Sequence, residues 1–160
     1  MTFFEKFSKA TEPKHWPGDM EADHYIYSAG IAGEKFFTAL RDEGKILGAQ
    51  CKSCHVTYVP PRIYCEKCFA ELNEKNLIDV GLRGRVKAFT VARIDKSGQK
   101  LAKPEIFAII EFGPGTTGLL HKLGEVEAEK VKTNMEVEAV LRPKHERQGK
   151  ITDIAYFRPI

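Results

Sequence analysis

The four cysteines of this 160-residue chain form two Cys-x-x-Cys pairs, Cys51 with Cys54 and Cys65 with Cys68, with ten residues between the pairs. Each pair can present two thiolates from a tight turn, and two such pairs supply the tetrahedral four-sulfur shell that zinc prefers. Two disulfides and a rubredoxin-like iron site are the competing interpretations, and disulfides suit secreted chains. A four-thiolate shell is closed, so the pattern predicts one structural zinc that does no chemistry.

A zinc ribbon over residues 47–75 must position these sulfurs. Residues 58–63 are expected to form its hairpin. Pro60 and Pro61 lack the N–H that an interior strand donates, so they favour a stiff, exposed turn. His55 directly follows the first cysteine pair, and we interpret it as a neighbour of the metal shell or a surface residue, because four thiolates already satisfy the metal.

The C-terminal part, residues 76–160, predicts a barrel. Residues 84–94 alternate in a way typical of a strand with one buried face, to which Ala88 and Thr90 are assigned. One or two helical turns are expected over residues 125–131. Five strands with a helix between the third and the fourth is the order of an OB-fold. The predicted strands are residues 84–94, 105–112, 117–123, 135–141 and 151–157.

The N-terminal segment, residues 1–46, predicts helices and a surplus of aromatic surface. A capping box indicates a short helix over residues 2–9, and apolar spacing indicates a second over 32–43 that stops at Gly44. Two short helices cannot bury all the aromatic side chains of this segment between themselves. The excess packs either in the protein's own core or on a partner subunit. The expected partner contacts are Tyr25, Tyr27, Phe36 and Phe37.

The fold class is therefore mainly β with N-terminal helices, a rubredoxin-like zinc ribbon and a five-stranded OB-fold barrel. No stretch approaches the roughly 20 apolar residues of a membrane span, and the N-terminus lacks the apolar run of a signal peptide, so a cytoplasmic protein is expected. The net charge of +3 is close to neutral. A mild positive bias after residue 75 fits a phosphate-bearing ligand and also fits an ordinary solvated surface.

Patterns for nucleotide binding or nucleophilic catalysis are weak. The glycine-rich connector 113–118 lacks a closing Gly-Lys-Ser/Thr and a following helix, so we interpret it as a flexible hairpin and not as a phosphate cradle. The five histidines lie in unrelated stretches, and none has a nearby free cysteine or a Gly-x-Ser-x-Gly serine to activate. Such a chain is better suited to docking than to catalysis.

Several motifs resemble one family: Tyr25-x-Tyr27-x-x-Gly30, the two cysteine pairs, the Tyr-Val-Pro-Pro-Arg run at 58–62 and the terminal Tyr-Phe-Arg-Pro at 156–159. They are similar to the zinc-ribbon plus OB-fold proteins catalogued as domain of unknown function thirty-five, over about residues 16–160. The resemblance implies a non-catalytic, acyl-CoA-associated accessory or scaffold subunit that docks on thiolase-type enzymes. One archaeal protein of this kind bridges an acetoacetyl-CoA thiolase and a hydroxymethylglutaryl-CoA synthase.

Coenzyme A is the ligand that this role would involve. Its phosphates need cations, and its adenine and pantetheine need an aromatic or apolar face. Candidate cations lie on the ribbon and around the first long loop of the barrel, although each also suits a plain surface. They are Arg62, Arg93, Lys96, Lys100 and Lys103.

Two alternatives belong to other functional classes. OB-folds and zinc ribbons also bind single-stranded nucleic acid, and the first barrel strand offers Phe89 with Arg85, Lys87 and Arg93 on its predicted outward face. The near-neutral net charge argues against this binding. Electron transfer through iron in the four-thiolate site is the third hypothesis.

Overall fold

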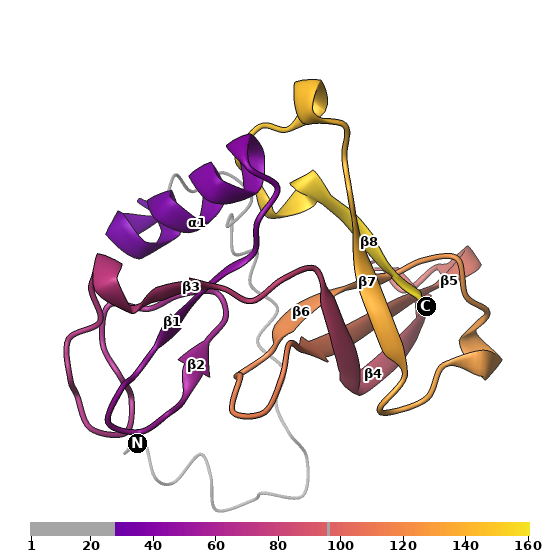
Figure 1. The fold of residues 1–160 in the computed structure, drawn as a ribbon. Coiled ribbons are helices and arrows are strands. Elements are labelled where there is room, and N and C mark those ends of the chain that lie inside the picture. The colour runs from indigo at the N-terminus through magenta and orange to yellow at the C-terminus, as the bar shows by residue number, and fades with distance from the viewer. Residues whose placement is uncertain (1–27, 96) are drawn as a thin grey trace, which may run out of the picture.

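The computed structural model describes residues 28–95 and 97–160, and it places one helix and a small sheet beside a β-barrel (Figure 1). Outside these ranges lie the predicted helix over residues 2–9 and three predicted contact residues, Tyr25, Tyr27 and Lys96. Within the described ranges, no helix is both long and apolar enough to cross a membrane.

Helix α1 (Gly30–Asp42) buries one face because its apolar residues recur at helical spacing. Phe36 and Leu40 are both buried. The helix ends shortly before Gly44, whose φ of 69° is a left-handed conformation that favours glycine. The predicted stop at Gly44 is confirmed, and the helix begins two residues earlier than the predicted range 32–43.

A three-stranded antiparallel sheet in the order β2-β1-β3 forms the ribbon. Its strands are β1 (Leu47–Gln50), β2 (Thr57–Tyr58) and β3 (Leu77–Asp79). The first cysteine pair lies in the turn between β1 and β2, where the Cys51 N–H donates to the Val56 carbonyl at 2.8 Å. The prediction that residues 58–63 form the ribbon hairpin is therefore wrong. Pro60 and Pro61 instead follow β2, which ends before them because they cannot donate to a ladder.

Five further strands close the barrel in the order β4-β5-β6-β8-β7, which is the OB-fold order that the sequence predicts. Strands β6 and β8 are parallel, and the other neighbouring strands of the barrel pair antiparallel. A short 3-10 turn over Ala128–Lys130 lies between β6 and β7, where the sequence predicts a helical turn. The strands are β4 (Arg83–Ile94), β5 (Lys100–Glu111), β6 (Leu119–Leu123), β7 (Glu136–Leu141) and β8 (Ile154–Pro159).

Strand β4 contains a bulge that reverses which side chains face the core. The pairing with β5 shifts between Val86 and Ala88, so that Phe89 lies opposite the buried Ala108. Ala88 and Thr90 are exposed on the outer face. Their predicted assignment to the buried face is wrong, because one extra residue in a strand moves every following side chain to the other face.

Strand β4 ends at Ile94 and β5 begins at Lys100, so the connection between them is short and is not the long loop that the sequence predicts. The Asp95 carboxylate accepts a hydrogen bond from the Gln99 N–H at 2.9 Å. Lys100 and Lys103 therefore lie on β5, where both are exposed.

One hydrophobic core connects the helix, the ribbon and the barrel. Phe36, Ile46 and Val59 pack in the same cluster as the barrel residues Ile110 and Phe157. A second, smaller cluster lies inside the ribbon and includes two of the cysteines. The helix thus packs against the rest of the molecule. The predicted division of the chain into three domains, residues 1–46, 47–75 and 76–160, remains a prediction.

Candidate metal centre and surrounding surfaces

The ribbon brings the four cysteine sulfurs together in a four-thiolate zinc-ribbon site. The Sγ atoms of Cys51, Cys54, Cys65 and Cys68 all lie within 4.8 Å of one another. Cys51 Sγ and Cys68 Sγ are 3.6 Å apart. A disulfide needs about 2.05 Å, whereas four thiolates about 2.3 Å from a tetrahedral zinc lie roughly 3.8 Å from one another. The arrangement therefore fits one structural zinc and does not fit a pair of disulfides.

The two cysteine pairs adopt the same turn. The Cys51 carbonyl accepts a hydrogen bond from the His55 N–H at 2.8 Å, and the Cys65 carbonyl accepts one from the Phe69 N–H at 2.9 Å. His55 and Phe69 have φ angles of 54° and 57°, a left-handed conformation that costs about 1 kcal/mol for a residue with a side chain. Each turn directs its two thiols toward one point. The two Cys-x-x-Cys pairs, which have the same spacing in the sequence, therefore have the same backbone geometry in the structure. His55 itself is an exposed surface residue.

Tyr58 holds one of the sulfurs from within the core. Its hydroxyl accepts a hydrogen bond from the Glu66 N–H at 3.1 Å and lies 3.2 Å from Cys65 Sγ. Because that hydroxyl oxygen already accepts from a backbone N–H, its own proton is free to donate to the sulfur. This hydrogen bond lowers the pKa of Cys65 to about 6 and raises the pKa of Tyr58 to about 12. Cys65 is thereby favoured in the thiolate form that binds metal.

Four neighbouring thiolates are unfavourable without a cation, and the pKa of Cys54 reflects this. Hydrogen bonding to Cys68, followed by burial, raises the pKa of the Cys54 thiol to about 12. Four thiolates at this distance repel one another strongly, and a divalent metal offsets that repulsion. Cys51 and Cys65 are buried while Cys68 is exposed, so the metal shell is open to solvent on one side. A zinc bound by all four sulfurs would have no position left for a substrate.

The glycine-rich connector 113–118 joins the barrel to the ribbon and is neither a phosphate cradle nor a free hairpin. The Thr57 N–H donates to the Gly115 carbonyl at 2.9 Å, and the Thr117 N–H donates to the Thr57 carbonyl at 2.9 Å. The Val59 N–H also donates to the Thr117 hydroxyl at 3.0 Å. The connector is therefore bound to the ribbon, and the Thr117 N–H that an anion could accept from is already donated to Thr57.

The four predicted coenzyme A cations that the structure describes do not line either of its two described pockets. Arg62 lies on the ribbon, where it pairs with Glu66 at 2.8 Å and lies 5.4 Å from the centre of the Tyr58 ring. Arg93 lies on β4 and is 4.0 Å from Glu129. Lys100 and Lys103 are exposed on β5. Their ligand-binding role stays a prediction.

Of the predicted partner contacts, the structure describes Phe36 and Phe37. Phe36 is 1% exposed and belongs to the core, so it is not available to a partner. Phe37 is half-buried, and its ring meets that of Phe36 edge to face at 5.2 Å between centroids. It lines a cavity of about 550 Å³ beside α1, together with Ile31, Arg41 and Gly149.

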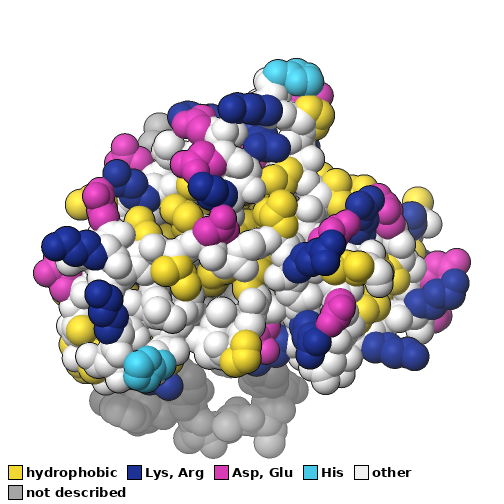
Figure 2. Space-filling model, viewed as in Figure 1, with side chains coloured by type: hydrophobic (Ala, Val, Ile, Leu, Met, Phe, Trp, Pro, Cys, Tyr) yellow, Lys and Arg dark blue, Asp and Glu magenta, His cyan; other side chains and the backbone are white. Residues whose placement is uncertain are grey.

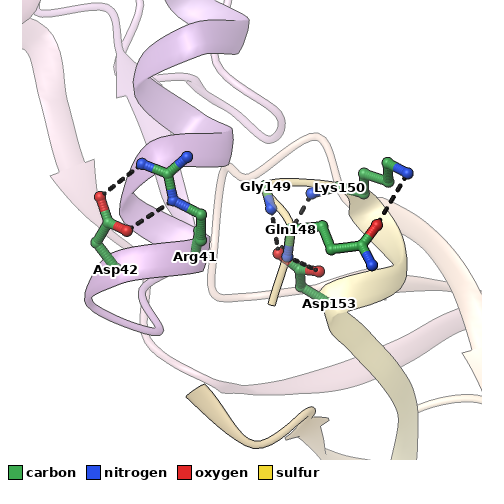
Figure 3. A network of polar contacts seen from close by, with 6 residues as sticks. All are labelled: Arg41, Asp42, Gln148, Gly149, Lys150 and Asp153. Atoms are coloured by element: carbon green, nitrogen blue, oxygen red, sulfur yellow. Dashed lines mark hydrogen bonds and ion pairs between the residues drawn. The ribbon is translucent and has the colours of Figure 1, made fainter. Parts of the chain in front are cut away.

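A loop against α1 is held by one buried carboxylate that no sequence pattern singled out. Asp153 is 1% exposed and accepts hydrogen bonds from the N–H groups of Gln148, Gly149 and Lys150 at 2.9, 2.7 and 3.2 Å (Figure 3). Burial alone would raise the pKa of Asp153, but these three donors outweigh it and the pKa is lowered. Arg41 of α1 lies near this loop and binds Asp42 through two hydrogen bonds (Figure 3).

Basic and acidic side chains are interspersed over the face shown in Figure 2, with hydrophobic side chains between them across the middle of the view. The cations predicted for nucleic acid are among the paired ones. Arg85 contacts Glu136 at 2.7 Å and Lys87 contacts Glu111 at 3.3 Å. Phe89 lies opposite the buried Ala108, on the other side of the strand from Ala88, and is 38% exposed.

An apolar surface that the sequence reasoning missed lies on the outside of β4, β5 and β6. We call it the apolar outer face, and its members are Ala88, Phe107, Ile109 and Leu120. A signal was present, because residues 105–112 are apolar at almost every position and alternation alone places some of them outside.

Comparison with known proteins agrees with this architecture. Residues 38–74 match the family described as "ChsH2, rubredoxin-like zinc ribbon domain", and residues 78–142 match "ChsH2, C-terminal OB-fold domain". A Pyrococcus furiosus protein named "DUF35 domain-containing scaffold protein" is 30% identical over 128 residues, which span 79% of this chain and 91% of that one.

Two solved structures share the fold. A Sulfolobus solfataricus protein of the DUF35 family with unknown function has a TM-score of 0.59 and 29% identity, and the match covers 81% of this chain and 84% of that one. An "Ltp2-ChsH2(DUF35) aldolase" chain has a TM-score of 0.55 and 19% identity over 78% of this chain and 91% of that one, a likeness in fold alone. From the ribbon, the barrel and these relatives together, the chain belongs to the DUF35 family.

Proposed function

We propose that this protein is a non-catalytic accessory subunit that docks on a thiolase-type or hydroxymethylglutaryl-CoA synthase-type enzyme of acyl-CoA metabolism. The observation that carries this proposal is the relation to a DUF35 scaffold protein, which is 30% identical across 79% of this chain. The fold neighbour named as an Ltp2-ChsH2(DUF35) aldolase supports an enzyme as the partner. We place the complex in the cytoplasm, because a reducing compartment keeps zinc-binding thiols reduced.

The chemistry of the described residues favours an accessory role. The group of metal-ligating side chains that residues 28–95 and 97–160 bring together is the cysteine centre. Its four thiolates fill a tetrahedral shell, so the zinc would hold the ribbon and would not activate water or a thioester. The zinc-ordered ribbon and the closed barrel then act as a rigid body that can position a second protein.

A contribution to coenzyme A binding is part of the proposal. Lys100 and Lys103 are exposed on the β4–β5 hairpin, close in sequence to Arg93. Exposed cations attract phosphate groups, but they hold a ligand firmly only where a pocket excludes water. We therefore expect the partner enzyme to supply most of the coenzyme A site, with these cations at its rim.

The test is affinity purification of the tagged full-length protein from its native cells, with partners identified by mass spectrometry. We expect a thiolase-type enzyme in a fixed molar ratio, and acyl-CoA turnover by the complex but not by the isolated chain. Turnover by the isolated chain would refute the accessory role. Recovery of nucleic acid with sub-micromolar, salt-sensitive affinity, and of no acyl-CoA enzyme, would favour the nucleic-acid alternative.

A further inference from the structure

The apolar outer face is one continuous patch, because its members lie in register on three neighbouring strands. Ala88 of β4 is opposite Ile109 of β5, and Ile109 is opposite Leu120 of β6. Phe107 lies two positions before Ile109 and so projects from the same face of β5. Directly opposed side chains in a sheet are about 5 Å apart, which makes the three strands present a single apolar surface.

Large apolar side chains of this patch are exposed to solvent. Leu120 is 65% exposed and Ile109 is 37% exposed. Single apolar residues on a surface are common, but neighbours that join across three strands are typical of an interaction site. Strands β5 and β6 are the second and third strands of this barrel. In OB-folds, the face formed by the second and third strands binds ligands.

The charges around the patch cancel within the face itself. Lys122 pairs with Glu105, and Lys87 pairs with Glu111 at 3.3 Å. A phosphate backbone needs unpaired cations as well as stacking aromatics. Phe107 is aromatic, but the cations Lys122 and Lys87 are both engaged by carboxylates of the same face. A neutral rim around an apolar centre instead complements a protein surface of the same kind.

The way in which a partner can bind follows from the closed barrel. Strand β5 is hydrogen-bonded to β4 on one side and to β6 on the other, so it has no free edge to which a partner could add a strand. At β5, contact therefore occurs through side chains that pack on the face. Four side chains suit the apolar centre of a standard interface of about 800 Å² per partner, and are too few for an obligate homodimer, which buries more and is more apolar.

We propose that the apolar outer face is the surface on which the thiolase-type enzyme subunit docks, with Leu120 and Ile109 as its central contacts. This inference rests on the proposed function, because the enzyme subunit is the partner that function supplies. An apolar protein surface seats against Leu120 and Ile109, and the two ion pairs form part of the polar rim that excludes water around them.

The experiment compares full-length variants in the same co-purification. Leu120→Glu places a charge at the centre of the patch, and Leu120→Met keeps an apolar side chain of similar size. Ile160→Glu is the matched control, because Ile160 is 61% exposed and lies at the C-terminal end, beside β7. Zinc content and thermal unfolding of every variant establish that each is folded.

We expect Leu120→Glu to reduce the recovered enzyme at least tenfold, with Leu120→Met and Ile160→Glu within about twofold of the wild type. A photo-crosslinking residue at position 120 should label the enzyme subunit, and one at position 160 should not. Equal recovery with Leu120→Glu overturns the inference and leaves the proposed function standing. Loss of a homodimer or of oligonucleotide binding in Leu120→Glu also overturns it. If the wild type recovers no thiolase-type enzyme, the proposed function itself fails.

Discussion

Thr117 of the barrel binds Thr57 of the zinc ribbon through a backbone hydrogen bond of 2.9 Å between the Thr117 N–H and the Thr57 carbonyl. The Thr117 hydroxyl also accepts a hydrogen bond from the Val59 N–H at 3.0 Å. Thr57 is buried, so water does not replace these contacts easily. The relative position of the metal centre and the barrel is thus set by a few polar contacts together with the shared core.

We expect Thr117→Val to lower the free energy of unfolding by about 1–2 kcal/mol. The substitution keeps the side-chain shape and leaves the Val59 N–H without its acceptor. Urea denaturation at neutral pH measures the difference. Thr133→Val is the control at an exposed position and should change stability by no more than about 0.5 kcal/mol. Equal stability of the two variants would mean that the hydroxyl contact does not hold the ribbon to the barrel.

The purified protein should be colourless and contain close to one zinc per chain. Cys65→Ser should lose most of the metal and unfold the ribbon, because the small cluster around Ala49 and Leu72 is too limited to hold it alone. Elemental analysis and protease sensitivity measure both effects. Ser53→Ala, between the first two ligands, is the control and should retain the zinc. Bound iron in the native protein, or four freely reactive thiols, would contradict a structural zinc.

Tyr58→Phe should weaken zinc binding about 10- to 100-fold, the usual effect of removing a hydrogen bond to a metal ligand. The ring keeps its place in the core, while Cys65 loses the hydroxyl that favours its thiolate. Competition with a zinc chelator at fixed pH gives the affinity. Tyr64→Phe alters an exposed tyrosine one residue from the same cysteine and should leave the affinity unchanged. An equal loss in both variants would rule out the specific role of Tyr58.

Asp153→Asn should destabilise the protein by about 2 kcal/mol at pH 7, because three backbone N–H groups lose a charged acceptor that is itself buried. The pKa of Asp153 is lowered in the folded state. Its carboxylate therefore contributes stability that is fully present above the unfolded pKa of about 3.9 and is lost as the pH falls through the folded value.

The difference between wild type and Asp153→Asn should consequently shrink as the pH is lowered below about 4. Thermal unfolding from pH 7 to pH 2.5 measures this dependence. Asp42→Asn changes an exposed carboxylate that binds Arg41 at the surface, and it should have only a small effect. A difference that stays constant over the whole range would show that Asp153 does not act through its charge.

The metal centre and the barrel order could be predicted from local patterns in the sequence. Two Cys-x-x-Cys pairs predict that four sulfurs converge on one metal ion. The helix ends at Gly44 because the left-handed backbone at this position favours glycine. Alternating strands with a helical turn between the third and the fourth indicated the OB order. Each of these features depends on residues close together in the chain.

The features that the sequence could not determine all depend on contacts between distant segments. Phe36 became a core residue because the ribbon and the barrel cover it, which no helical period reveals. A bulge after Val86 turned Ala88 outward, and pairing with β5 and β6 placed it beside Ile109 and Leu120. Strand register is decided by both strands of a pair, so only the tertiary structure shows which apolar side chains are buried and which are presented to a partner.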